Sequence, residues 1–572
     1  MAKKNPKKKN DGYYRPPLGN NKGATNYSVT QPSVLPKGLP KKTRSLCPEC
    51  LNIIDARIFE EDGKVYIDKT CPDHGYVKDV YWSDVEQYLA AEKHARDGIH
   101  LENPNVQSTK ECPGNCGLCD MHFSHTCLAI VDLTNRCNFN CPICFANAND
   151  AGYVYEPDYD TIIGMLKQLR DERPVPCPAV QFSGGEPTIY PRILDVIQAA
   201  WDMGFMQTQI ATNGLTLATK KGFAQQLADH HLHSVYLQFD SLRDDYYEEI
   251  RGRKNLTALK DKAVENCRGI KPVSDDLERK VKPTTLSTIL VPTVVNTLND
   301  SEVGDILRYA IKNIDVIRGV NYQPVAFTGR IDDKERESQR FTLPDLVNRL
   351  TTQTDGWFRK EDFYSVPCVT PISELTSIIQ KNPKVAFTAH PHCGWATYVF
   401  VHKNEVTPIP RFFKVEKFFS DMEQMAQKYG QDTLGNKMKL AAGGLFAKSD
   451  KLKASYMRKQ INKYYIPDEA PPELDKDTVV DLVTNVFMGG NKEALADFAW
   501  NTLFIGGMHF QDAYNYDTNR VARCVIHYSV PGGRIIPFCA YNGGPFYRRE
   551  VESKYSVPLD EWKKNHKIAK DE

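Results

Sequence analysis

Six strand-like runs between residues 127 and 330 constrain the fold most strongly. They span 128–133, 179–183, 207–212, 234–240, 285–291 and 317–323. The segments between them are long enough for helices, and in the first of these Ile162, Met165, Leu166 and Leu169 recur at helical spacing. Strands that alternate with helices pair in parallel through helical crossovers. The sequence therefore predicts an α/β fold whose ligands gather at the carboxyl ends of the strands.

A cysteine motif follows the first of these runs. The segment RCNFNCPICFA places Cys137, Cys141 and Cys144 in a C-x3-C-x2-C spacing. Three thiolates so spaced can bind three corners of a cubane [4Fe-4S] cluster and leave the fourth iron open to a small molecule. A structural zinc site is the alternative, but zinc sites usually pair cysteines as C-x2-C and use four protein ligands. The spacing favours iron and sulfur.

Three further polar motifs lie at the ends of the next runs. Ser183-Gly184-Gly185-Glu186-Pro187 follows the second run, Thr212-Asn213-Gly214 the third, and Gln238-Phe239-Asp240 the fourth. Each is also ordinary turn or strand-end chemistry when taken alone. Because parallel strands end at one rim, all three motifs are expected beside the cysteines.

The cysteine motif together with GGEP resembles the radical S-adenosylmethionine (SAM) superfamily. This resemblance implies a partial (β/α)6 barrel, a SAM-binding cluster on Cys137, Cys141 and Cys144 that starts catalysis, and an electron donor such as ferredoxin or flavodoxin. It also implies SAM contacts from Gly184, Gly185, Glu186, Pro187, Thr212, Asn213, Gln238 and Asp240. Reductive cleavage of SAM yields a 5'-deoxyadenosyl radical, so the protein's part is to aim and shield the cofactor.

An N-terminal knuckle is predicted from Cys47, Cys50, Cys71 and His74. The pattern is C-x2-C followed by C-x2-H, with the strand-like IFEEDGKVYI and an Asp62-Gly63 turn between the halves. It resembles a rubredoxin or zinc-ribbon knuckle that holds one iron or zinc ion, with His74 or a later cysteine as the fourth ligand. A structural role is favoured, since metal binding can stabilise a small domain.

Two more groups of cysteines predict auxiliary [4Fe-4S] clusters. The compact group is Cys112, Cys116, Cys119 and Cys127; the dispersed group is Cys368, Cys393, Cys524 and Cys539. Cys177 and Cys267 stand alone and are expected to be small buried residues. Cys127 precedes the first strand and Cys137 follows it, and six strand residues span about 20 Å. The compact group is therefore expected near the opposite end of the barrel, and the dispersed group near the substrate.

Length and composition set the domain expectations. A chain of 572 residues predicts several domains: a disordered basic tail (1–44), a knuckle and cluster region (45–126), the barrel (127–330), and a C-terminal α+β cluster-bearing domain (331–572). The net charge of +1 predicts no nucleic-acid partner. No run approaches the ~18 to 20 apolar residues of a membrane span, and no secretory signal is evident, so a cytoplasmic location is expected.

The cysteine-rich segments also resemble a narrower group, the archaeal tetraether lipid synthases. This resemblance implies joining of the terminal methyl carbons of two isoprenoid chains in archaeal membrane lipids, at the membrane surface. The apolar stretch 494–510 is then either buried core or a wall for a lipid chain. Two alternatives stay open: a radical SAM C-methylase acting on 7,8-dihydro-6-hydroxymethylpterin, and a non-catalytic metal and iron-sulfur scaffold.

Overall fold

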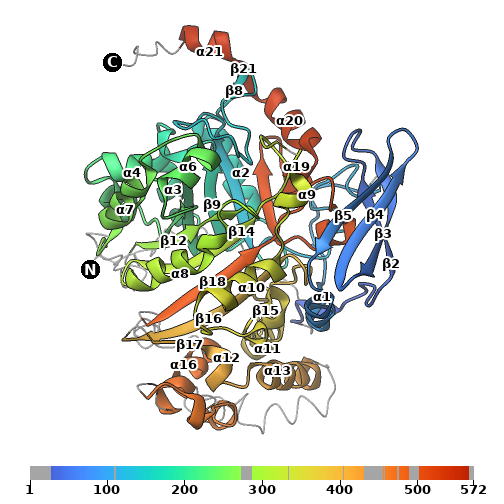
Figure 1. The fold of residues 1–572 in the computed structure, drawn as a ribbon, viewed down its shortest axis with the longest axis vertical. Helices are drawn as coiled ribbons and strands as arrows, with labels where there is room; N and C mark the ends of the chain where they lie inside the picture. Colours follow the sequence, from blue (N-terminus) through green and yellow to red (C-terminus); the bar gives the residue numbers. More distant parts are fainter. Residues whose placement is uncertain are drawn as a thin grey trace, which may run out of the picture.

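A large mixed sheet organises the chain (Figure 1). The computed structural model describes residues 27–108, 111–271, 286–332, 334–403, 405–430, 455, 458–472, 474, 476–488 and 501–565. Within these residues, thirteen strands belong to the sheet. Most of the predicted tail lies outside the described residues.

The six predicted strands are all present and parallel, which confirms the α/β barrel. In spatial order they are β14 (Ile317–Pro324), β12 (Ser287–Val291), β11 (Ser234–Gln238), β10 (Gln207–Thr212), β9 (Ala179–Gly184) and β7 (Leu128–Thr134). β11 ends at Gln238, so Phe239 and Asp240 of the fourth-strand motif lie just beyond the strand, although the predicted run extends to residue 240. The carboxyl ends of the strands form one rim, as predicted.

The C-terminal region extends the sheet at both edges. β18 (Thr502–Met508) pairs in parallel with β14, and β19 (Ile526–Val530) pairs in parallel with β7. Antiparallel strands follow on each side: β16 (Gly394–His402), β17 (Glu405–Pro408) and β15 (Tyr364–Ser365) beyond β18, and β20 (Arg534–Pro537) beyond β19. The predicted boundary at residue 330 therefore does not divide the sheet.

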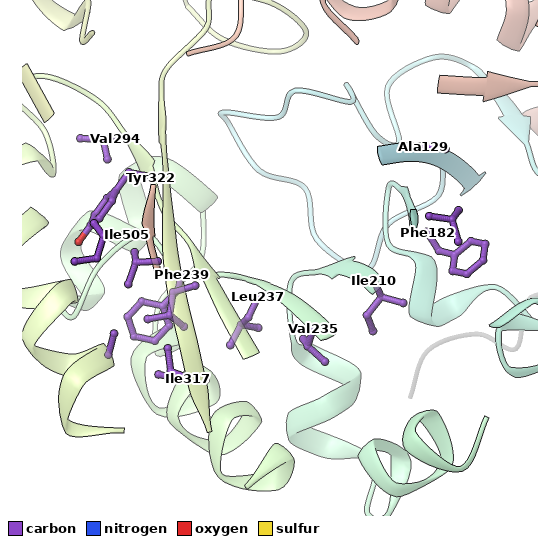
Figure 2. Packing of buried hydrophobic residues seen from close by; sticks show 14 of the residues in the cluster. Ala129, Phe182, Ile210, Val235, Leu237, Phe239, Val294, Ile317, Tyr322 and Ile505 are labelled. Atoms are coloured by element: carbon purple, nitrogen blue, oxygen red, sulfur yellow. The ribbon is translucent and has the colours of Figure 1, made fainter. Parts of the chain in front are cut away.

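Helices cover the outer face of the barrel. They are α2 (Tyr159–Arg170), α3 (Ile193–Asp202), α4 (Leu215–Thr219), α5 (Phe223–Asp229), α6 (Asp244–Arg251), α7 (Leu256–Cys267), α8 (Val303–Lys312) and α10 (Leu343–Gln353). Alternate strand residues such as Phe182, Val235 and Ile505 pack against them in one buried apolar cluster (Figure 2). The predicted helical residues Ile162, Met165, Leu166 and Leu169 are buried on α2. Burial of these alternating faces fixes which side chains point into the barrel.

An antiparallel sheet forms the N-terminal domain and docks against the C-terminal strands (Figure 1). Its strands are β2 (Lys41–Leu46), β3 (Ile53–Glu61), β4 (Lys64–Cys71) and β5 (Gly75–Trp82), and α1 (Val85–Ala91) follows. Asp62 and Gly63 both have positive φ, as a tight hairpin turn requires. The buried Arg340 bridges the two parts, since it donates to Asp79 of β5 and to Asp512 after β18.

A second apolar core lies among helices beyond the sheet edge. It joins α11 (Thr370–Gln380), α12 (Ile409–Phe412), α13 (Val415–Gly430) and α16 (Lys476–Met488). The predicted helical stretch 415–457 is thus helical to residue 430, and residues 431–454 lie outside the described part. Of the apolar stretch 494–510, residues 502–508 form β18 within the sheet, and residues 494–500 are outside the description. The described helices include none with the length and apolar character of a membrane span.

The C-terminal elements return to the barrel rim. α18 (Thr518–Val521), α19 (Phe538–Gly543), α20 (Pro545–Lys554), β21 (Ser556–Pro558) and α21 (Leu559–Asn565) complete the chain. β21 pairs with β8 (Tyr153–Tyr155), which follows the cysteine motif. Arg548 of α20 donates to the buried Asp132 of β7. These contacts place α20 beside the first barrel strand and β21 beside β8.

Candidate functional site

The cysteines of the C-x3-C-x2-C motif lie together on the loop after β7. Cys137, Cys141 and Cys144 are all half-buried. Burial raises the pKa of the Cys137 thiol to about 12, and the neighbouring charges of Glu186, Cys141 and Cys144 act in the same direction. Thiols with a raised pKa stay protonated in the absence of a metal, and a bound metal holds them as thiolates. The three side chains therefore share one neighbourhood, and their donor chemistry fits a cluster bound at its three protein-ligated corners.

Asn149 shapes this loop from within. Its Oδ1 accepts a 2.9 Å hydrogen bond from the Cys137 amide, and its Nδ2 donates to the carbonyls of Cys137 and Phe139, each at 2.9 Å. One side chain thus holds the first turn of the loop at both its N–H and C=O groups. The motif needs this support because an irregular loop otherwise leaves backbone groups unpaired.

Gly184 and Gly185 pack directly on the backbone that enters the loop. A Cβ atom would approach the Thr134 carbonyl oxygen to 2.1 Å at position 184 and the Arg136 carbonyl oxygen to 2.2 Å at position 185. Gly184 also has a φ of +123°. The amides of Gly185 and Glu186 donate to the Thr134 and Arg136 carbonyls at 2.7 and 2.9 Å. Only glycine allows this approach, so GGEP and the cysteine loop form one unit.

Glu186 fastens this unit to the third strand. Its buried carboxylate accepts hydrogen bonds from Thr188, from the Thr212 hydroxyl at 2.7 Å and from the Asn213 amide at 2.8 Å. Asn213 in turn donates from Nδ2 to Asn138 Oδ1 at 2.7 Å. The carboxylate of Glu186 therefore accepts hydrogen bonds within the protein, and its predicted contact with SAM stays a prediction. The prediction for the backbone of residues 184–187 stays open.

A buried ion pair links the fourth strand to the cysteine loop. Arg251 donates to both oxygens of Asp240, at 2.8 and 2.7 Å, and to the Ile143 carbonyl at 2.8 Å. Burial alone would raise the pKa of Asp240, but the Arg251 guanidinium keeps it below its usual value. Asp240 is thus held as an anion by Arg251, which also binds the loop, and its predicted contact with SAM stays a prediction.

Lys260 lies beside this pair at the rim. Its ammonium group donates to the Asn213 carbonyl at 2.7 Å and to Gln238 Oε1 at 3.2 Å. Burial lowers the pKa of Lys260 to about 7. Gln238 is therefore oriented by Lys260 and by its own hydrogen bond to Asp240. The predicted residues of the third and fourth strand ends meet at one place, as their spacing suggested.

Arg330 closes the loop from the far side of the barrel. Its backbone pairs with Cys144 through two 2.9 Å hydrogen bonds, and its Nε donates to the Cys141 carbonyl at 2.7 Å. Arg251, Lys260 and Arg330 were not predicted. None belongs to a motif, and a buried or loop-bound cation carries no local pattern that distinguishes it from a surface cation.

The compact auxiliary group is only partly assembled. Burial raises the pKa values of Cys112 and Cys116, and nearby Cys119 adds to both shifts. Cys127 lies elsewhere: its thiol donates to the Ala386 carbonyl at 3.3 Å, and the cysteines that affect its pKa are Cys177 and Cys524. The structure therefore brings together three members of the predicted set, and the four-cysteine cluster stays a prediction.

The dispersed group also loses one member. Burial raises the pKa of Cys524, and nearby Cys539 and Cys393 add to this shift. Cys368 instead has Lys93 as its electrostatic neighbour. Around the other three, Nη1 of Arg520 and both ring nitrogens of His509 are buried without a hydrogen-bond partner among the described residues, and Arg520 Nε donates to Cys393 Sγ at 3.4 Å. Orphaned polar atoms beside three thiols fit a bound cluster.

The predicted separation of the two auxiliary groups is wrong. Cys112 and Cys116 share one apolar cluster with Cys524, Cys539 and Phe145, the residue after Cys144. Leu118 donates to the Ile535 carbonyl at 2.8 Å on β20. Cys524 also adds to the rise in the pKa of Cys116, so the compact and dispersed groups lie near each other rather than at separate ends of the barrel.

The N-terminal knuckle is the most fully assembled metal site. The ligand atoms of Cys47, Cys50, Cys71 and His74 all lie within 4.8 Å of one another. His74 Nδ1 is 3.6 Å from Cys47 Sγ and 3.5 Å from Cys71 Sγ, and the Cys50 and Cys71 sulfurs are 3.9 Å apart. Three thiolates and one imidazole are a common tetrahedral zinc set. Among the open choices for the fourth ligand, the structure brings His74 into the group.

Comparison with known families and proteins agrees with this geometry. The family model of the radical SAM superfamily matches residues 131–310, and that of the HMPTM N-terminal zinc ribbon domain matches residues 39–83. The 7,8-dihydro-6-hydroxymethylpterin dimethyltransferase of Methanocaldococcus jannaschii is 44% identical over 532 residues, which cover 93% of this chain and 98% of that protein.

More distant proteins share only part of the chain. The GTP 3',8-cyclase of Clostridium acetobutylicum is 24% identical over 44% of this chain and 76% of its own length. Among solved structures, Streptococcus suis SuiB bound to S-adenosylmethionine is 18% identical over 41% of this chain and 48% of that chain, with a TM-score of 0.30.

Proposed function

The chain belongs to the family of the M. jannaschii 7,8-dihydro-6-hydroxymethylpterin dimethyltransferase, and from that membership we propose that it methylates carbon atoms of the same pterin. It is a radical SAM enzyme with an N-terminal zinc ribbon. The prediction of lipid coupling is wrong, because the relative that matches nearly the whole chain is named for a pterin reaction. The pterin alternative replaces it.

The residues around the loop supply binding and order rather than proton transfer. When bound, SAM and a [4Fe-4S] cluster provide a 5'-deoxyadenosyl radical, and that chemistry belongs to the cofactors. We assign the cluster to Cys137, Cys141 and Cys144. Asn149, Arg251 and Arg330 hold the loop that carries them.

The polar interior of the barrel supports a heterocyclic substrate. Gln209 donates from Nε2 to Gln181 Oε1 at 2.8 Å, and Gln207 donates to Gln209 Oε1 at 3.1 Å. Both Gln181 and Gln209 lie on strand faces opposite to the outward apolar residues. Amide groups suit a molecule with hydrogen-bonding edges, whereas an isoprenoid chain offers them neither donors nor acceptors.

GTP cyclisation is less well supported by the charges near the interior. Arg251 is paired with Asp240, Arg330 with Asp150, and Arg548 with Asp132 and Glu552. Guanidinium groups already held by carboxylates are poor ligands for a triphosphate. Neutral amides and phenols suit an uncharged pterin better.

The test is anaerobic reconstitution with SAM, a reductant and 7,8-dihydro-6-hydroxymethylpterin. Dithionite serves first, and ferredoxin or flavodoxin is the proposed natural donor. We expect 5'-deoxyadenosine formation that rises when the pterin is added, and a product heavier by one methylene unit for each methyl group gained. Cys141→Ala should abolish both, and Cys267→Ala is the matched control. Turnover with GTP but not with the pterin would overturn the proposal.

A further inference from the structure

The strand register defines a complete layer of side chains inside the barrel. Pairing across the strands places Ser183 level with Asp132, Tyr236 with Ala211 and Ile289, and Phe504 with Gly319 and Tyr398. The outward residues of the same strands pack on the helices in Figure 2, so these residues face inward. The layer lies two residues, about 7 Å, beneath Gln238 at the rim.

Short side chains line one side of this layer, and aromatic side chains line the other. Ser183 and Ala211 are half-buried and short. Opposite them, the Tyr398 and Phe504 rings meet at 5.4 Å between centroids and at 62° between planes. Tyr398 is 51% exposed although it lies on an inward face. Solvent therefore reaches an aromatic ring on the inward face of the sheet.

The surroundings of Tyr398 are those of a recess rather than of an outer surface. Burial among protein atoms raises the pKa of its phenol despite the exposed ring. Burial also raises the pKa of Tyr236. The Tyr398 phenol adds to that shift, which indicates that the two phenols lie near each other. Protein atoms therefore surround the phenol of Tyr398, although half of the residue is exposed to solvent.

An amide floor lies one layer deeper. Gln181 pairs in register with Gln209, and the Gln209 side chain also hydrogen-bonds the Tyr236 phenol. The three side chains thus form one connected polar group below the aromatic side. Each Gln amide offers both a donor and an acceptor.

We propose that this layer is the pterin-binding slot, in which Tyr398 stacks on the flat ring system and the amides of Gln181 and Gln209 bind its hydrogen-bonding edge. The assignment rests on the proposed function and names the part of the barrel that recognises its substrate class. A pterin has a planar bicyclic face and an edge that alternates N–H donors with carbonyl and ring-nitrogen acceptors. The slot offers an aromatic face with paired amides one layer below it, and the predicted SAM residue Gln238 lies two residues above Tyr236.

The experiment measures binding without turnover. Fluorescence quenching of oxidised 6-hydroxymethylpterin reports its Kd for the reconstituted holoenzyme. Tyr398→Ala should weaken binding about tenfold, whereas Tyr398→Phe should stay within about twofold, because stacking needs the ring and not the hydroxyl. Gln209→Met should weaken binding about tenfold or more, because it leaves polar edge atoms unpaired. The controls are Tyr76→Ala on the N-terminal sheet and Gln198→Met on α3, which should match the wild type.

The outcomes separate this assignment from the proposed function. If the wild type binds the pterin and Tyr398→Ala and Gln209→Met bind it equally well, the slot is elsewhere. If these variants weaken SAM binding as much as pterin binding, their effect is structural, and the assignment also fails. If the wild type neither binds nor methylates the pterin, the proposed function fails.

Discussion

Gly185 lies so close to Arg136 that a Cβ atom at position 185 would come within 2.2 Å of the Arg136 carbonyl oxygen. The same glycine donates its amide to the Thr134 carbonyl at 2.7 Å. Backbone atoms cannot yield as a flexible side chain can. The turn after β9 and the entrance to the cysteine loop therefore have one joint geometry.

Gly185→Ala should disable the loop. The added methyl group forces the two backbones apart, which costs about 1–3 kcal/mol and displaces Cys137 from its neighbours. We expect less iron bound after reconstitution and loss of most SAM cleavage, measured by iron content and 5'-deoxyadenosine yield. Gly164→Ala on α2 is the matched control: nothing lies within 4 Å of its Cβ, so it should retain full activity. Full iron content in Gly185→Ala would contradict this account.

Arg251→Met should destabilise the barrel strongly. It leaves the buried Asp240 carboxylate without its cation, and breaking a buried pair from one side costs about 3–5 kcal/mol. Thermal and urea unfolding should show a large loss, and the iron content should fall because the Ile143 carbonyl also loses its donor. In the double variant with Asp240→Asn, the unpaired buried charge is removed, so part of the stability should be recovered. Arg243→Met removes an exposed pair at the opposite end of α6 and should unfold as the wild type does.

His74→Ala should remove zinc without removing iron. The variant takes away the imidazole that completes the ligand group of the N-terminal domain. Metal analysis should show loss of about one zinc per chain, with the iron-sulfur content unchanged. Cys267→Ala, a buried cysteine on α7 outside every group, should change neither metal. Loss of iron together with zinc would show that the knuckle also supports the clusters.

Glu172 should give stability a dependence on pH. Burial raises its pKa from 4.5 to about 7, although Thr126 donates two hydrogen bonds to the carboxylate. Between these values the folded protein keeps a proton that the unfolded chain releases, so stability falls as the pH rises, and above pH 7 the cost is fully present. Glu172→Gln has no carboxyl group to ionise at this position, so its stability does not carry this cost.

The stability of Glu172→Gln relative to the wild type should therefore increase between about pH 5 and about pH 8, by up to about 3 kcal/mol. Urea unfolding of both proteins at the two pH values measures the difference. Glu265→Gln, an exposed carboxylate on α7, should show no such change. A difference that is the same at both pH values would mean that the folded protein releases the Glu172 proton as readily as the unfolded chain does, so that burial does not raise the pKa.

The sequence by itself determined the periodic and contiguous features. The barrel strands from β7 to β14 were predictable from their alternating apolar residues. Burial of one face of each strand gives the sequence a two-residue period that is visible along the chain. The cysteine loop and the N-terminal knuckle were predictable for a related reason: their ligands lie close together in sequence, so their spacing carries the chemistry. GGEP belonged to this class as well, since two adjacent glycines at a strand end mark a close approach of backbones.

Only the tertiary structure decided what depends on distant segments. Cys127 is eight residues from Cys119, yet it lies apart from it, whereas Cys116 and Cys524 share one apolar cluster. The edges of the sheet are completed by β18 and β19, whose partners lie far away along the chain. Arg251 and Tyr398 carry no motif at all, because their roles come from burial and from the space beside them. Long-range packing is a property of the whole chain, so no local pattern records it.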